Sequence, residues 1–140
     1  MAAERVLDTG LDHLFARALI AIARTDDQIG LKKGLRLQQR IALRVASPIS
    51  LDELLLAEPL DPHRLADSLR GAAPFRGAGV HPGELAVMLI TDAIAVVLAK
   101  GYVSEAEAGV IVRFASALGC PLDEVRALCS RAAPWLGTMI

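Results

Sequence analysis

Hydrophobic residues recur along this chain at the three- and four-residue spacing of amphipathic or buried helices. The pattern is strongest in residues 11–25 and 82–101, where aliphatic side chains cover more than one face. No segment alternates apolar and polar residues over the length of a strand, which is the usual pattern of a half-buried sheet. The chain is therefore predicted to be all-α.

Two parts of the chain repeat one pattern. Residues 12–45 align without a gap with residues 86–119, at an offset of 74 positions. In each copy an apolar helix leads into a short polar turn that holds one apolar residue, Ile29 or Val103, and a second helix follows. Leu-Asp-Glu segments beginning at Leu51 and Leu122 then follow at an offset of 71. We expect a compact bundle with an internal pseudo-twofold repeat.

Capping signals divide the chain into about seven helices. Thr9 is a plausible N-cap, Asp61-Pro62 starts a helix, and Ser50 and Ser104 each begin a capping box with a glutamate three residues later. The expected helices span residues 11–25, 31–46, 50–57, 61–71, 82–101, 104–119 and 120–132. A single domain over residues 1–140 is predicted, with repeat one at about 11–58, a connector at 59–83 and repeat two at about 84–132.

Composition excludes several classes of protein. The chain is 54% hydrophobic but only 4% aromatic, which favours packed helices over a β-sandwich. A net charge of −1 gives no general attraction to nucleic acid, so a nucleic-acid partner is disfavoured. The most apolar segment, residues 85–99, is shorter than the roughly 20 residues of a membrane span. With two distant cysteines and no secretory signal, we expect a cytoplasmic protein.

The turns of the two copies read Thr25-Asp26-Asp27-Gln28-Ile29-Gly30-Leu31-Lys32-Lys33 and Ala99-Lys100-Gly101-Tyr102-Val103-Ser104-Glu105-Ala106-Glu107. They resemble the TerB-like (tellurite resistance) family, whose turns carry an Asp-Gly, an apolar residue two positions on, and a Glu that opens the next helix. The resemblance covers about residues 11–132. It implies a pseudo-symmetric helical bundle and a binding or scaffold role in tellurite-type or other stress responses. The family is not established as enzymatic, and some members bind metal.

The acidic turn positions are those to which the resemblance assigns a divalent metal, and Asp26, Asp27 and Glu107 are the candidate ligands. Lys33 stands where the first turn should have its Glu, and Lys100 stands where the second should have its Asp. Because two ammonium groups oppose a divalent cation at short range, we expect ion pairs in its place, either within each turn or crosswise. A retained regulatory metal site is the alternative. Solvated acids with Glu107 in a capping box would be a purely structural outcome.

A basic stripe follows the second helix at four-residue spacing, formed by Lys32, Arg36, Arg40 and Arg44. Like charges at this spacing repel, so acids from other helices should offset them. Binding of a phosphate, a nucleic acid or an acidic partner is the functional alternative.

Asp92 is surrounded along its helix by apolar residues, so we expect it to be buried and paired with an arginine or a helix terminus. An enzyme built around Asp92 is the least favoured reading, because no nucleotide-binding, hydrolase or metalloprotease motif is present. Cys120 lies at a predicted helix N-terminus, where a thiolate is favoured. The sequence thus predicts a non-enzymatic module with a protein partner, and its many aliphatic positions also allow a homodimer.

Overall fold

A computed structural model describes residues 7, 10–26, 29–45, 48–56, 61–71 and 82–140. These residues form helices and connecting turns, with no strand among them. The all-α prediction is therefore confirmed. The elements in chain order are α1 (Leu11–Ala23), α2 (Leu31–Ala42), α3 (Leu51–Leu56), α4 (Pro62–Gly71), α6 (Pro82–Val97), the 3₁₀ turn η2 (Leu98–Lys100), α7 (Glu105–Ala117), α8 (Leu122–Ala132) and α9 (Pro134–Gly137).

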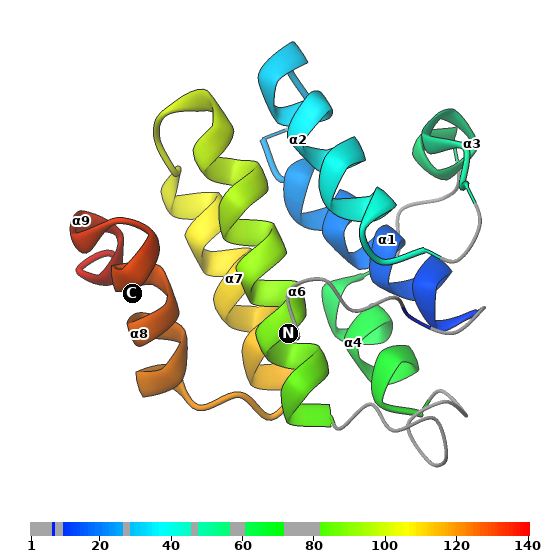
Figure 1. The fold of residues 1–140 in the computed structure, drawn as a ribbon. Helices are drawn as coiled ribbons and strands as arrows, with labels where there is room; N and C mark the ends of the chain where they lie inside the picture. The colour runs from blue at the N-terminus through cyan, green and yellow to red at the C-terminus, as the bar shows by residue number, and fades with distance from the viewer. Residues whose placement is uncertain (1–6, 8–9, 27–28, 46–47, 57–60, 72–81) are drawn as a thin grey trace.

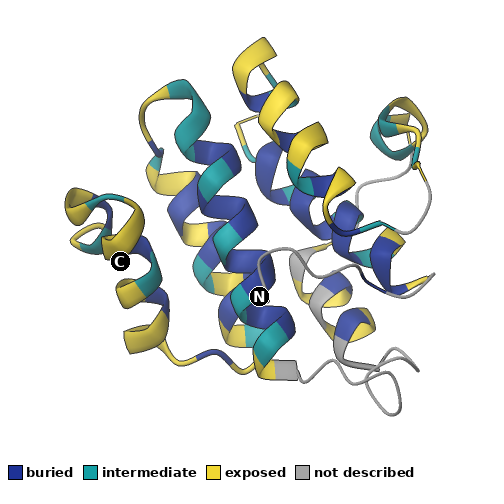
Figure 2. Ribbon diagram, in the orientation of Figure 1, coloured by how far each residue is buried: buried dark blue, intermediate teal, exposed yellow. Residues whose placement is uncertain are grey.

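Helix α6 is the centre of the bundle. It packs against α1 and α2 on one side and against α7 and α8 on the other (Figure 1). Helix α4 packs against α1 and α7, and α9 folds back onto α8. The buried surfaces of α1, α6 and α7 face one another (Figure 2), and their side chains are almost all aliphatic. No described helix has both the length and the apolar character that a bilayer crossing requires.

The helix hairpins α1–α2 and α6–α7 occupy the places expected for the two copies. The elements that follow them differ in length, since α3 has 6 residues and α8 has 11. The pseudo-twofold relation between the copies stays a prediction.

Several helix boundaries differ from those expected, each for a local reason. The N-cap of α1 is Gly10, not Thr9, and its φ of 97° suits a glycine. Helix α1 ends at Ala23 because the Thr25 hydroxyl donates to the carbonyl oxygen of Ile22 at 2.8 Å and competes with the helical pattern. The last long helix begins at Leu122, because the preceding Pro121 is an extended N-cap.

Helices α2 and α3 also end earlier in the sequence than predicted. Helix α2 ends at Ala42, where the Arg44 amide turns back to the Ile41 carbonyl. Helix α3 ends at Leu56, and the expected last residues of these two helices, Ala46 and Ala57, lie outside the described part of the chain.

Candidate functional site

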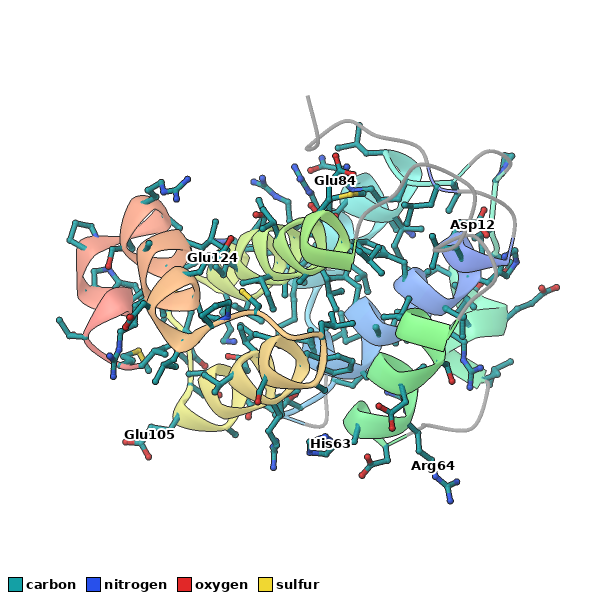
Figure 3. The ribbon with its side chains drawn as sticks, turned by 90° about the horizontal axis from the view of Figure 1, so that it is seen from below. Asp12, His63, Arg64, Glu84, Glu105 and Glu124 are labelled. Atoms are coloured by element: carbon teal, nitrogen blue, oxygen red, sulfur yellow. The ribbon has the colours of Figure 1, made fainter. Side chains whose placement is uncertain are left out.

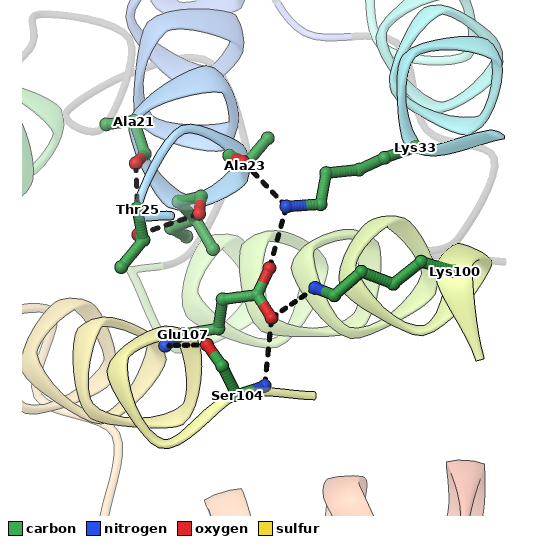
Figure 4. Close-up of polar contacts among 8 residues, drawn as sticks. Ala21, Ala23, Thr25, Lys33, Lys100, Ser104 and Glu107 are labelled. Atoms are coloured by element: carbon green, nitrogen blue, oxygen red, sulfur yellow. Dashed lines mark hydrogen bonds and ion pairs between the residues drawn. The ribbon is translucent and has the colours of Figure 1, made fainter. Parts of the chain in front are cut away.

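The two turns singled out by the sequence lie side by side in the structure. The C-terminal end of α1, the first turn of α2, η2 and the first turn of α7 meet at one point (Figure 4). Glu107 lies at this point with no solvent exposure. We call the group formed by Glu107, Lys33, Lys100, Ser104 and the Ala23 carbonyl the Glu107 clamp.

The orientation of Glu107 is set by a capping box at the start of α7. The Ser104 hydroxyl accepts a hydrogen bond from the Glu107 amide at 3.1 Å, and Glu107 Oε1 accepts one from the Ser104 amide at 3.0 Å. This reciprocal pair satisfies two of the amides that a helix N-terminus leaves without partners. The capping box predicted from the sequence is confirmed, and it aims the carboxylate toward α1 and α2.

Two lysines, one from each turn, bind the Glu107 carboxylate. Lys33 Nζ lies 2.8 Å from Oε2, and Lys100 Nζ donates to Oε1. Lys33 is itself only 3% exposed, and its ammonium also donates to the Ala23 carbonyl oxygen at 2.9 Å. The free carbonyls at the C-terminus of α1 carry partial negative charge, which helps to stabilise this buried cation.

The electrostatics of the clamp favour the ionised carboxylate. Burial alone raises the pKa of Glu107, but the hydrogen bonds from Lys100, Lys33 and the Ser104 backbone outweigh it, so the pKa lies below the ordinary value of a glutamate. Lys100 is further held by the Tyr102 ring, whose centroid is 4.8 Å from the ammonium nitrogen.

These residues do not fit a divalent metal. Both oxygens of Glu107 are already bound by ammonium groups, which would repel a cation at the same point. Asp26 is exposed and forms no ion pair with another described residue, while Asp27 lies outside the described residues. Among the described residues no three potential ligands of the His, Cys, Asp or Glu type come together. The expected ion pair between Lys100 and Glu107 is present, and Lys33 pairs crosswise with Glu107 rather than with Asp26.

A second buried carboxylate, Asp92 in α6, also faces two cations. Arg44 donates to Oδ2 from Nε at 2.8 Å and to Oδ1 from a terminal nitrogen at 3.0 Å. Arg40 donates to Oδ1 from Nε at 2.8 Å, and its second nitrogen binds the same oxygen. Asp92 and Arg44 are fully buried and Arg40 is 19% exposed, so this Asp92 cluster ties α2 to α6.

The predicted basic stripe is therefore divided between the interior and the surface. Arg40 and Arg44 turn inward to Asp92, whereas Lys32 and Arg36 are exposed. Neither the spacing of the stripe nor the apolar positions of α2 could reveal this division from the sequence, because leucines lie on the exposed face of the helix as well. Leu37 and Ile41 are buried, and Lys33, Arg40 and Arg44 stand three or four residues from them on the same helical face.

The cysteines are free and buried, and neither has the character of a reactive thiolate. Burial, together with the nearby Glu124 carboxylate, raises the pKa of Cys120 to about 11. Burial alone raises the pKa of Cys129 to about 11. The thiolate expected at Cys120 from its place near a helix N-terminus is thus disfavoured, because burial and the Glu124 carboxylate both oppose a negative charge on the sulfur.

We expect the substitution Glu107→Gln to destabilise the fold by about 3 kcal/mol, because it leaves Lys33 buried without a counter-charge. The free energy of unfolding from urea denaturation measures the loss. Glu105→Gln is the matched control, since Glu105 belongs to the same first turn but points away from the bundle (Figure 3). A loss of equal size in both variants would contradict the role assigned to the clamp.

The contribution of Glu107 should depend on pH in a defined direction. Its pKa is lower in the folded chain than in the unfolded chain, so its contribution is complete above the unfolded value and is lost as pH falls through the folded value. Urea denaturation at a series of pH values should show the stabilities of the wild type and Glu107→Gln converging in acid. A constant difference between them down to pH 2 would argue against an ionised carboxylate in the clamp.

The substitution Asp92→Asn should cost about 3–5 kcal/mol, because it leaves Arg44 fully buried without an anion. Asp123→Asn, at a side chain that is 98% exposed, is the control and should cost less than about 1 kcal/mol. Thermal melting followed by circular dichroism compares the two variants, and near-equal melting temperatures would show that the Asp92 cluster contributes little.

No protein-family model, characterised protein or solved structure matches this chain. The TerB-like resemblance therefore rests on the two turns and the repeat pattern alone.

Proposed function

We propose that this chain is a TerB-like interaction or scaffold module in which an internal ion-pair clamp stands in place of the acidic metal site. One observation carries the proposal: both oxygens of Glu107 are bound by lysines from the two turns. Its role would be non-enzymatic and cytoplasmic, in a bacterial stress response of the tellurite type, as the family resemblance implies.

The state of the buried charges supports a binding role over catalysis. Asp92 is fully buried and binds arginines through both of its oxygens, so a substrate cannot reach it to give up a proton. Every buried side-chain nitrogen or oxygen of the described residues has a hydrogen-bond partner. An active site would instead be expected to hold polar groups aimed at a substrate in a pocket.

The main alternative is a regulatory protein that binds a divalent metal through Asp26, Asp27 and Glu107. For this, a cation would have to displace two ammonium groups from Glu107. A hard cation such as Ca²⁺ also needs six or more oxygens, and Glu107 already shares Oε1 with the Ser104 amide. These competing bonds make the clamp the better supported function of the turns.

Anion or nucleic-acid binding by the basic stripe is a lesser alternative. Only Lys32 and Arg36 stay at the surface, because Arg40 and Arg44 bind Asp92. Two exposed cations make a weak electrostatic site for a polyanion at physiological salt. The same two residues nevertheless give this face of α2 a local positive charge.

The metal alternative is tested by melting the protein in Ca²⁺, Mg²⁺ or Zn²⁺ at millimolar concentration. We expect no rise in the melting temperature of the wild type, because two ammonium groups already hold both oxygens of Glu107, and only an ion that binds the folded state would stabilise it. The double variant Lys33→Glu/Lys100→Asp restores the acids of the family pattern. It should be less stable without metal, because of like-charge repulsion, and should regain stability with a divalent ion.

A metal-dependent rise in the wild type would overturn the proposed function and favour the regulatory alternative. If the double variant showed no response to any of the three ions, the two turns would not be an ancestral metal site. Protein treated with EDTA is the metal-free reference for both the wild type and the double variant.

A further inference from the structure

Helix α2 and the two residues that follow it depart from the usual order of charged and apolar residues at five positions. Lys33 and Arg44 are buried, while Leu31, Leu35 and Leu43 are 81%, 53% and 38% exposed. A surface helix normally buries its apolar face and exposes its charges. The Glu107 clamp and the Asp92 cluster explain why these cations are inside, but they do not explain the leucines outside.

The exposed leucines form a row along α2. Leu31, Leu35 and Leu43 share one line of four-residue spacing, in which Gln39 takes the remaining place. Figure 2 shows this outer face of α2 as largely exposed. Rows of this spacing are the ridges by which one helix packs against another. We call Leu31, Leu35, Gln39 and Leu43 the leucine row.

A groove runs beside the leucine row, between α2, the segment at Pro48 and α3. Its volume is about 460 Å³. Seven of the eight residues that line it are apolar, and none is charged; they are Gln38, Ile41, Ala42, Val45, Pro48, Ile49, Leu51 and Leu54. The two features meet at the C-terminal end of α2, where Ala42 of the groove precedes Leu43 of the row, and together we call them the apolar surface of α2.

The charges on α2 beside the leucine row have one sign. Lys32 directly follows Leu31 in the sequence, and Arg36 directly follows Leu35. Both cations are exposed, and neither forms an ion pair with a described residue. Helix α2 contains no acidic residue. Across the groove, α3 carries the exposed acids Asp52 and Glu53, which line the groove no more than Lys32 and Arg36 do; the two cations adjoin the leucine row, and the two acids do not. A complementary partner would therefore carry acids beside the leucine row.

We propose that this surface binds an amphipathic helix of a protein partner, with an aliphatic seam on the leucine row and groove and acidic side chains beside Lys32 and Arg36. The inference deepens the proposed function by naming its binding surface, and it rests on that function. An elongated apolar groove beside a ridge of four-residue spacing suits a helix, which offers side chains at matching intervals.

Two other occupants fit less well. A second copy of the chain packing α2 against α2 would offer no acid to Lys32 or Arg36, because α2 has none. An anionic membrane would satisfy the two cations, but a flat bilayer does not fill a groove between two helices. The partner helix satisfies both the charge and the shape of the surface.

The test uses two synthetic amphipathic peptides of about five helical turns with the same leucine seam, one flanked by glutamates and the other by lysines. Fluorescence anisotropy in low salt measures the Kd of each peptide for the full chain. We expect the glutamate peptide to bind at least tenfold more tightly than the lysine peptide. Leu35→Asp should weaken it tenfold or more, and Lys32→Glu/Arg36→Glu should reverse the preference.

Leu122→Asp is the matched control, because Leu122 is a similarly exposed leucine (43%) on α8, and it should leave the Kd unchanged. Circular dichroism melting checks that Leu35→Asp stays folded, as its exposure predicts. Equal binding of the two peptides, or binding insensitive to Leu35→Asp, would overturn the proposal. So would a dimer in sedimentation, or binding to phosphatidylglycerol vesicles, that Leu35→Asp abolishes.

The peptide-binding and metal-melting experiments together distinguish a failure of this inference from a failure of the proposed function. If neither peptide binds and divalent ions leave the melting curve unchanged, the assignment of the binding surface is wrong. The proposed interaction module with a clamp in place of a metal site is then retained. If divalent ions stabilise the wild type, the proposed function fails whatever the peptides do.

Discussion

The bond between Glu107 and its two lysines is the constraint on which the arrangement of the bundle depends. A buried carboxylate has to be paired, and Glu107 takes one ammonium from each of the two turns. The same Lys33 ammonium also closes the C-terminus of α1 through the Ala23 carbonyl. Aliphatic packing alone tolerates small shifts of one helix along another, whereas these directional bonds accept only one relative position of α1, α2 and α7.

Helix α2 is tied to the bundle by charge near both of its ends. Lys33 in its first turn binds Glu107, and Arg44, just beyond its last turn, binds Asp92. Between these two points Leu37 and Ile41 pack into the core. Because these contacts fix the inner face of α2, Leu31 and Leu35 lie on its outer face in contact with solvent. The buried ion pairs and the exposed apolar surface are two consequences of the same helix orientation.

Much of the local structure follows from the sequence because its causes are local. The Ser104 capping box and the glycine end of η2 depend on residues a few positions apart, and both are where they were expected. The boundaries that differ, at Thr25 and Pro121, do so because a side-chain or cap geometry competes with the helix in a way that periodicity does not register. The pairing of Asp92 with arginine follows from its apolar neighbours, although which arginines take part does not.

By itself the sequence determined the helical segments, the aliphatic core and the need of the buried Asp92 for a partner, since these depend on residue type and spacing. It did not determine that Lys33 crosses to Glu107, 74 residues away, or that Arg40 and Arg44 leave the surface while Lys32 and Arg36 stay on it. Only the packing of α2 against α6, η2 and α1 decided those points, because rotating a helix changes which of its neighbouring charges are buried. The same rotation decided that Leu31, Leu35 and Leu43 would be exposed.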